Sequence, residues 1–322
     1  MTVEWRWQPY VELARVDQWL KNVAILPGVI VAVAFRPGLE RAHAGRIALC
    51  ILAACLLSSS NYVLNGILDT STDRAHPVKR SRPLPAGRVR RGAAWSAWAA
   101  LAAAGLPLAF AVNREVGWTA VVFWLMALVY NVPPLRTKDV PYADVIVESA
   151  NNPLRLSLGW FTVIADRLPP ISLLAAYWAL GAFFLTVKRL AELRFLESRE
   201  RPAAAYRRAF AHYGEEHLLA AAALHLVLCA FFTGVFVVRF KLELILILLP
   251  GALFLAYYLR LGLRPESPAQ SPERVFRRPA LAGYLVVCVL LFLILLHTDI
   301  PALYRWFNVE AASTRALWRL DP

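Results

Sequence analysis

Cysteine is scarce in this chain and follows no site pattern. The 322 residues contain four cysteines, all within apolar runs and with no CxxC spacing. Zinc sites and disulfide frameworks need closely and regularly spaced ligands. The sequence therefore argues against both kinds of site, and we expect four small core residues: Cys50, Cys55, Cys229 and Cys288.

Acidic residues are scarce as well. Asp and Glu number 22 against 35 Lys and Arg, which gives a net charge of +13. In a soluble protein this excess would suggest nucleic acid as a partner. Here hydrophobic residues make up 59% of the chain, above the roughly 45–50% typical of soluble domains. We therefore expect a membrane protein that meets membrane lipids with anionic headgroups or phosphorylated substrates, and no nucleic acid.

The chain also lacks a low-complexity tract and any hydrophilic stretch that would form a second, soluble domain. It contains instead nine apolar segments, most of which approach the roughly 20 residues that a helix needs to cross a bilayer. They cover residues 17–36, 46–68, 92–112, 115–132, 141–164, 169–190, 218–238, 241–261 and 280–298. This pattern predicts an all-α, polytopic membrane protein with about nine transmembrane helices in a single domain, 1–322.

The distribution of basic residues predicts the orientation. If successive loops alternate between the two sides, 24 Lys and Arg lie on the side of the N-terminus and 10 on the other side. Positively charged loops stay in the cytoplasm, so the N-terminus is predicted inside and the C-terminus outside. The cytosolic loops are then the longer ones, which often carry the chemistry of a rigid scaffold. They are residues 69–91, 133–140, 188–217 and 260–278.

A polar ridge stands out in the segment that starts at residue 61. Asn61, Asn65, Asp69 and Asp73 recur every four residues, so on a helix they share one face over about 18 Å. Mg²⁺ prefers oxygen ligands and is usually held by one or two carboxylates together with substrate phosphates. The two aspartates, one helical turn apart, supply that arrangement.

Cations follow the ridge within ten residues. Lys79, Arg80 and Arg82 lie between prolines that stiffen the loop, and His76 could also touch phosphate. Carboxylates that hold a metal, together with cations that hold phosphate oxygens, form a clamp for a metal-bound diphosphate. The structural alternative is that the aspartates cap the helix end or pair with Arg74 and Lys79.

A second polar constellation lies in the segment 141–164. Asp144, Glu148 and Asn152 share one helical face, and Arg155 follows three residues later. We expect this face to lie opposite the first across a cytosol-facing cavity, with Asp144 and Glu148 on a second metal or on substrate hydroxyls. The alternative is a simple ion pair between Glu148 and Arg155.

Further cations lie at the predicted cytosolic ends of spans. Arg136 and Lys138 lie just outside a span and would reach phosphate oxygens. Lys188 and Arg189 end the sixth span, where snorkelling to the interface is the alternative. Lys21 lies at the start of the first span and is open to the same two interpretations.

Three of these elements together resemble a known family. They are Asn65-x-x-x-Asp69-x-x-x-Asp73, then Arg80-x-Arg82-Pro83, then Tyr130 followed by Pro134-Leu135-Arg136-x-Lys138. The pattern resembles the UbiA superfamily of intramembrane prenyltransferases. The resemblance covers nearly the whole chain, and it implies nine helices around a cavity that opens laterally for a polyprenyl chain. It also implies aspartate-rich motifs that bind Mg²⁺ and diphosphate.

Within the superfamily, the segments RVDQWLKNVAILPG, DRAHPVKRSRPLPAG and KRLAELRFLE with RRAFAHY are similar to one branch, the polyprenyl-phosphate phosphoribosyltransferases. That resemblance implies Mg²⁺-dependent transfer of a 5-phosphoribosyl group from phosphoribosyl diphosphate to a polyprenyl phosphate, with release of diphosphate, in a bacterial cytoplasmic membrane. The product would be a precursor of a cell-envelope glycolipid. The chain departs from the family at Gly66, where the family has an aspartate, so we expect one metal-facing carboxylate to be missing. The segment VESANNPLRLSLGW also differs from the branch.

The number of cations favours a phosphoribosyl donor, because that donor carries a 5-phosphate and the acceptor is itself a phosphate. An aromatic prenyltransferase that uses a prenyl diphosphate is one alternative, and a lipid transporter or scaffold is another, since polar residues in spans also mark transport pathways. The sequence leaves a homo-oligomer open. The residues assigned to catalysis are Asp69, Asp73, Asp144 and Glu148, of which the first two are metal ligands. Those assigned to substrate binding are Lys21, Asn61, Asn65, Lys79, Arg80, Arg82, Tyr130, Lys138, Asn152, Arg155, Lys188 and Arg189.

Overall fold

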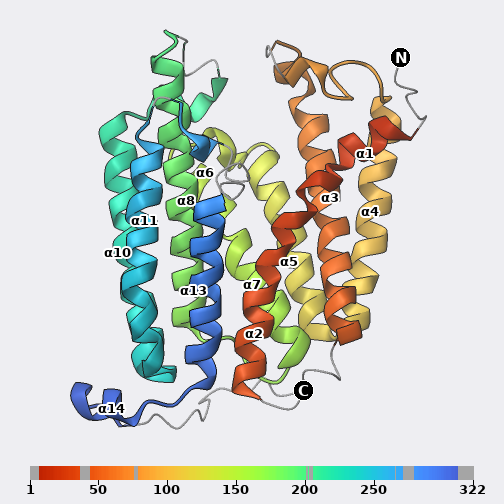
Figure 1. Ribbon diagram of the computed structural model, residues 1–322. Helices are drawn as coiled ribbons and strands as arrows, with labels where there is room; N and C mark the ends of the chain where they lie inside the picture. The colour runs from red at the N-terminus through yellow and green to blue at the C-terminus, as the bar shows by residue number, and fades with distance from the viewer. Residues whose placement is uncertain are drawn as a thin grey trace. The chain divides into compact units, whose positions relative to one another are not determined.

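The structure is a computed structural model that describes residues 7–36, 44–75, 79–200, 202, 206–264, 266–270 and 279–310. All regular secondary structure in these residues is helical, with no strand among them (Figure 1). The chain divides into two compact units, one up to Leu168 and the other from Pro169. That the whole chain forms a single domain stays a prediction, and each unit is described by itself.

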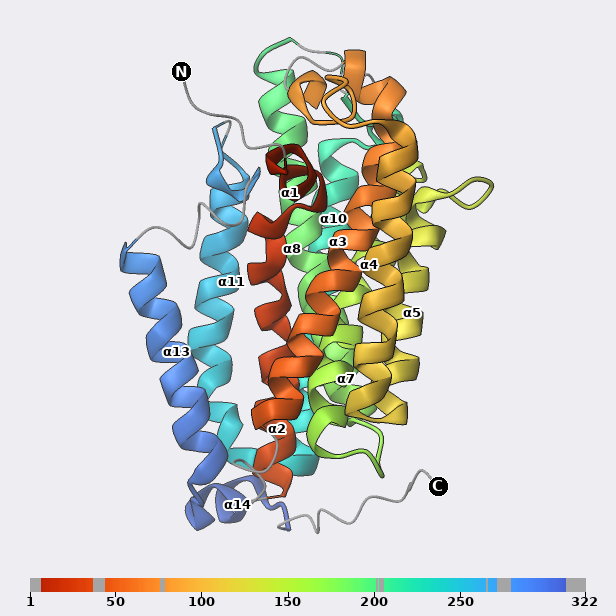
Figure 2. The same ribbon diagram turned by 90° about the vertical axis from the view of Figure 1, so that its right-hand side faces the viewer.

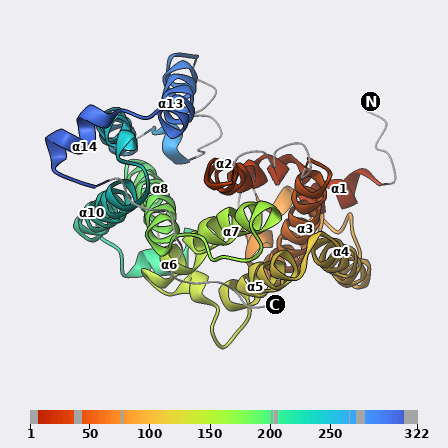
Figure 3. The ribbon, with the colours of Figure 1, turned by 90° about the horizontal axis from the view of Figure 1, so that it is seen from below.

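Within its described residues, the first unit contains seven α-helices and three 3₁₀ segments. Their bounds are α1 Gln8–Ala14, the 3₁₀ segment η1 Val16–Ile25, α2 Leu26–Phe35, α3 Ala44–Ala75, η3 Lys79–Ser81, α4 Arg91–Val112, α5 Arg114–Asn131, η4 Thr137–Asp139, α6 Ala143–Ser149 and α7 Asn151–Val163. The long α3 packs along α4 and α5, and α2 packs along α7 (Figures 2 and 3).

Three consecutive serines attach α3 to its neighbours. Ser58 donates to Oδ1 of Asn22 at 3.2 Å, and Ser59 accepts from the indole of Trp19 at 2.9 Å. Ser60 donates to the carbonyl of Trp98 in α4 at 3.0 Å. In a membrane, where apolar burial against lipid contributes little, such interhelical hydrogen bonds help to fix the packing.

Two glycines allow α2 and α7 to approach closely. A Cβ atom on Gly28 would lie 1.9 Å from the carbonyl oxygen of Leu156, and one on Gly159 would lie 2.1 Å from that of Ile25. Both contacts are with backbone, which cannot move aside as a side chain can. Small residues at such crossings let helix backbones pack directly on one another.

Within its described residues, the second unit contains four long α-helices, a short terminal one and three 3₁₀ segments. Their bounds are α8 Ile171–Glu197, η5 Arg208–Ala211, α10 Glu215–Phe240, η6 Leu242–Ile247, α11 Leu248–Gly262, η7 Pro268–Gln270, α13 Pro279–His297 and α14 Pro301–Phe307. The helices α8 and α10 lie side by side (Figures 1 and 3).

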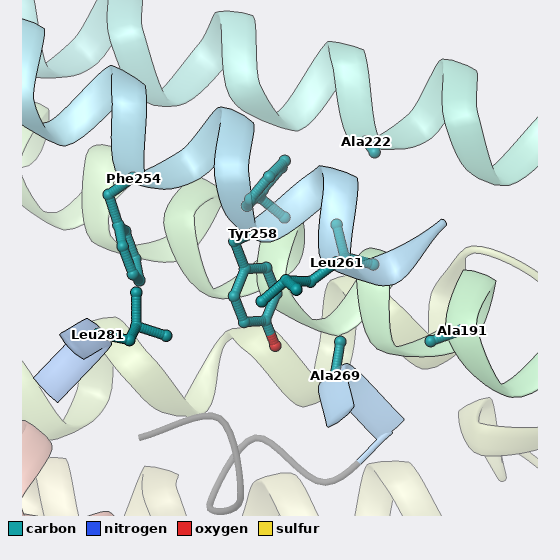
Figure 4. Packing of buried hydrophobic residues seen from close by; sticks show 9 residues of the cluster. Ala191, Ala222, Phe254, Tyr258, Leu261, Ala269 and Leu281 are labelled. Atoms are coloured by element: carbon teal, nitrogen blue, oxygen red, sulfur yellow. The ribbon is translucent and has the colours of Figure 1, made fainter. Parts of the chain in front are cut away.

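The core of the second unit reaches into a segment that looks like a plain connector in the sequence. Ala269, within the Pro- and Ser-rich stretch after α11, is fully buried. It belongs to the same apolar cluster as Phe183, Tyr258 and Leu281 (Figure 4). Part of this connector is therefore packed as core.

The membrane-spanning character is confirmed. Seven helical stretches in the described residues are long and apolar enough to cross a bilayer. They are 8–35, 44–74, 91–112, 171–197, 215–240, 242–262 and 279–297. Of the nine expected segments, the other two correspond to α5, which begins with two charged residues, and to the pair α6 and α7, which is interrupted at Ala150. The count of nine spans stays a prediction.

Candidate functional site

The polar ridge lies on one unbroken helix, because α3 continues to Ala75. Asp69 and Asp73 lie near its end, and both are paired with cations. Asp69 accepts from Lys138 at 2.6 Å and from Arg136 at 3.0 Å. Asp73 accepts from Arg82 at 2.8 Å. The aspartates are therefore ion-paired, as the structural alternative expects, but with cations other than the two that it names.

Lys138 is the most enclosed of these cations, with 8% of its surface exposed. Its Nζ donates three hydrogen bonds, to Oδ1 of Asp69 at 2.6 Å, of Asn65 at 3.0 Å and of Asn131 at 3.0 Å. An ammonium group has three N–H donors, so all three are used. Burial lowers the pKa of Lys138 from its ordinary value, and the charge of Asp69 opposes that effect.

Arg136 reaches α3 from a constrained backbone. Its φ is 29°, in the left-handed region that residues with side chains rarely adopt. The side chain bridges two carboxylates, with Nε 2.8 Å from Asp139 and an Nη 3.0 Å from Asp69. The loop between α5 and α6 is thus turned so that its two basic residues lie against the end of α3.

Arg82, in the loop after α3, is a direct partner of the ridge. Asp73 is 3% exposed and is held by Arg82, whose side chain is 35% exposed. Lys79 is half-buried and Arg80 is exposed. His76 lies outside the described residues. At the N-terminal end of the ridge, Asn61 has a buried Oδ1 with no hydrogen-bond partner in the described part of the chain.

The second constellation is placed in α6 and α7. Asp144 is completely buried, and Glu148 accepts a hydrogen bond from the hydroxyl of Tyr130 at 2.9 Å. Asn152 is partly buried on α7. The contact between Tyr130 and Glu148 joins two residues that the sequence assigns to the site on separate grounds.

Arg155 is held on two sides. Its Nε donates to Oδ1 of Asn22 at 3.1 Å, and its guanidinium lies 5.0 Å from the ring centre of Phe123. Asn22 is 1% exposed and also accepts from Ser58, whereas the neighbouring Lys21 is exposed. The buried asparagine therefore contacts Arg155, a predicted site residue.

The remaining two predicted cations lie in the second unit, on α8. Arg189 is 1% exposed and donates to Glu192 at 3.2 Å. Because the guanidinium is enclosed and paired, snorkelling to the membrane interface does not describe it. Lys188 is partly buried.

Comparison with known proteins identifies the family. Residues 22–278 match the UbiA prenyltransferase family. The chain belongs to this family. It is a transferase family, and the fold agrees: a solved UbiA homolog from Archaeoglobus fulgidus bound to GPP and Mg²⁺ superposes with a TM-score of 0.64 over 89% of this chain and 98% of that one, at 20% identity.

Two curated proteins with similar sequences share the same name. The decaprenyl-phosphate phosphoribosyltransferase of Mycolicibacterium smegmatis is 28% identical over 65% of this chain and 63% of that protein. The enzyme of the same name from Corynebacterium glutamicum is 28% identical over 65% of this chain and 60% of that protein. The matched region thus spans less than two thirds of the length of either relative.

The UbiA motif departs from the family pattern at Gly66, and the structure shows where this position points. A Cβ atom there would lie 3.3 Å from Cδ1 of Leu13 and 3.6 Å from Cδ1 of Leu84. Both leucines belong to an apolar cluster with Val63 and Ile67. The Cβ position of residue 66 therefore lies against apolar side chains, and the loss of one metal-facing carboxylate at Gly66 stays a prediction.

The aspartates of the UbiA motif suit a magnesium ion in chemistry and in spacing. Lys138 and Arg136 both contact Oδ1 of Asp69, and Arg82 contacts Oδ2 of Asp73. The other oxygen of each carboxylate receives no hydrogen bond from the residues that the structure describes. Those residues contain no group of three His, Cys, Asp or Glu that could hold a metal by itself. Two carboxylates with a phosphate as a further ligand is the usual arrangement for Mg²⁺.

Sequence reasoning missed two residues of the site. Asn131 is 3% exposed, donates to the carbonyl of Ala127 and accepts from Lys138. Arg15 lies 5.2 Å from the ring centre of Tyr62 and interacts electrostatically with Asp73. Each is a polar residue at the edge of an apolar run, a pattern too common to single out either one.

Proposed function

We propose that the protein transfers a 5-phosphoribosyl group from phosphoribosyl diphosphate to a polyprenyl phosphate, with Mg²⁺, and releases diphosphate for the synthesis of a cell-envelope glycolipid precursor. The observation that carries this proposal is the density of cations around one pair of carboxylates. Arg82, Arg136 and Lys138 converge on Asp69 and Asp73. The names of the two curated relatives support the same donor and acceptor classes.

The aspartates of the ridge and the cations paired with them have different roles in this proposal. Asp69 and Asp73 would hold Mg²⁺, which when bound withdraws negative charge from the leaving diphosphate. Arg82 and Arg136 carry planar guanidinium groups that suit phosphate oxygens. They would orient the diphosphate so that its charge develops against fixed cations. The acceptor phosphate is already an anion and requires no general base.

The second constellation would bind the rest of the donor. Glu148, oriented by Tyr130, offers carboxylate oxygens to sugar hydroxyls. Arg155, held by Asn22 and by the ring of Phe123, would supply positive charge to a second phosphate group. The assignment of Lys188 and Arg189 to substrate binding rests on the sequence alone.

An aromatic prenyltransferase is the second candidate. The structure from Archaeoglobus fulgidus that shares the fold was bound to GPP, a prenyl diphosphate, and Mg²⁺. Both candidates release diphosphate, so Asp69, Asp73 and their cations would act alike. They differ in the group that follows the diphosphate and in the acceptor.

The test is a reconstituted reaction. Purified protein with Mg²⁺ and phosphoribosyl diphosphate should release diphosphate only when polyprenyl phosphate is added, and the sugar label should move into the lipid fraction. Turnover of a prenyl diphosphate with a hydroxybenzoate instead would favour the second candidate. No diphosphate release with either pair would favour a transporter or scaffold.

A double variant with a matched control links this reaction to the ridge. Asp69→Asn with Asp73→Asn should lower turnover by about 100-fold or more, while the protein still folds. Arg36→Gln also removes one partner of an arginine–aspartate pair, with Asp166. That pair lies at the ends of α2 and α7, away from the ridge, and its loss should leave turnover unchanged.

We further propose that the site faces the cytosol of a bacterium, with the N-terminus inside and the C-terminus outside. The excess of Lys and Arg in the loops on the side of the N-terminus supports this orientation. Alkaline phosphatase fused after residue 322 should be active, and a fusion within the loop 133–140 should be inactive. The reverse result would exclude this topology.

A further inference from the structure

The two aspartates of the ridge and Asp139 of the adjoining loop are each paired with cations. Asp69, Asp73 and Asp139 are each paired, and their partners are Arg82, Arg136 and Lys138. Three negative groups and three positive groups are joined by contacts of 2.6–3.0 Å. The same residues that the proposed function assigns to a metal and to a diphosphate are therefore occupied with one another.

This pairing opposes the binding of either ligand alone. A divalent cation that approaches Asp69 meets Lys138 and Arg136 on the same carboxylate, and these repel it. A diphosphate that approaches the cations meets carboxylates that repel it and hold the N–H donors. Because Asp73 and Lys138 are buried, water and salt screen these charges less than they screen charges at a surface.

We propose that the metal and the diphosphate bind this site cooperatively, by an exchange of partners. The carboxylates of Asp69 and Asp73 would turn from the cations to the metal, and the freed cations would donate to the phosphate oxygens. This inference rests on the proposed function, in which Asp69 and Asp73 hold the metal. Since coupling between two ligands is reciprocal, each ligand raises the affinity of the other by the same factor.

The structure indicates which side chains move. Arg82 and Arg136 are 35% and 22% exposed in their side chains, so both have room to turn from carboxylate to phosphate. Lys138 is fixed by Asn65 and Asn131 as well as by Asp69. When Asp69 turns to the metal, Lys138 keeps both asparagines and releases one N–H toward the diphosphate.

The exchange makes a prediction that a simple additive site does not. Removing a cation should strengthen metal binding when no diphosphate is present, because a carboxylate is freed. Removing a carboxylate should strengthen diphosphate binding when no metal is present, because cations are freed. In a site where the cations and the carboxylates do not interact, each of these changes leaves the affinity for the other ligand unaltered.

Two binding measurements on the full chain in nanodiscs test this. The EPR signal of free Mn²⁺ reports metal binding without diphosphate, and Arg136→Gln and Lys138→Met should each raise that affinity about fivefold or more. Binding of methylene diphosphonate in EDTA reports the other ligand, and Asp69→Asn should raise that affinity by a similar factor. Arg36→Gln, the matched control, should change neither.

The outcomes separate this inference from the proposed function. If Asp69→Asn with Asp73→Asn leaves Mn²⁺ binding intact, the metal site itself is wrong. If that double variant abolishes Mn²⁺ binding but Arg136→Gln and Lys138→Met leave the affinity equal or weaker, only the exchange is refuted. Arg136 is partly exposed, so its variant keeps the test open if Lys138→Met fails to fold, which thermal unfolding checks.

Discussion

Gly159→Ala should separate two helices that only glycine allows to touch. The added Cβ would lie 2.1 Å from the carbonyl oxygen of Ile25 and 2.9 Å from the amide nitrogen of Val29. Ordinary contact begins at 3.4 Å, so α2 and α7 would have to move apart by about 1 Å. Both opposing atoms are backbone, and no change of rotamer relieves the clash.

The expected cost follows from that displacement. Overpacking a well-packed interface usually costs about 1–3 kcal/mol, and we expect about 3 kcal/mol or more here because the whole helix pair must shift. A gap of 0.5–1 Å also forfeits roughly a quarter to a half of the dispersion energy of each contact. The displacement would also stretch the hydrogen bond of Arg155 to Asn22, now 3.1 Å.

Gly234→Ala is the matched control. It lies within a helix with nothing within 4 Å of its would-be Cβ, and the better helix propensity of alanine should stabilise it by about 0.5–1 kcal/mol. SDS titration of the protein in mixed micelles gives both free energies of unfolding. If Gly159→Ala is as stable as Gly234→Ala, the direct backbone contact between α2 and α7 is refuted.

Four further outcomes are expected. Asn131→Leu should cost about 1–3 kcal/mol in unfolding experiments, because it leaves one donor of Lys138 unsatisfied, and Asn131→Asp should recover most of the loss. Ser60→Ala should cost about 1 kcal/mol, since Ser60 bonds both Trp98 and Trp124. Gly66→Asp should lower stability without tightening Mn²⁺ binding, because position 66 faces Leu13. Burial lowers the pKa of Lys138 below 10.5, so between the folded-state pKa and 10.5 the unfolded chain binds more protons than the folded one. The free energy of unfolding should therefore rise with pH in this range. Lys138→Met should flatten that rise, and an unchanged slope would contradict the prediction.

The sequence by itself determined that this is a membrane protein, and it located the candidate site at the end of α3. Repeated runs of about 20 apolar residues indicate membrane-spanning helices, because that length crosses a bilayer and a helix satisfies its backbone hydrogen bonds internally. The four-residue spacing of Asn61, Asn65, Asp69 and Asp73 also fixes their common face, since helical geometry is local. These conclusions need no knowledge of which segments meet.

Only the tertiary structure decided which residues contact the ridge. Lys138 lies 69 residues from Asp69, and their contact depends on a left-handed backbone at Arg136 that turns the loop toward α3. Whether position 66 faces metal or leucine depends on where Leu13 and Leu84 pack. Contacts between segments distant in sequence follow from packing and not from local pattern. The ridge of α3 was therefore predictable, whereas the identity of the cations that pair with it was not.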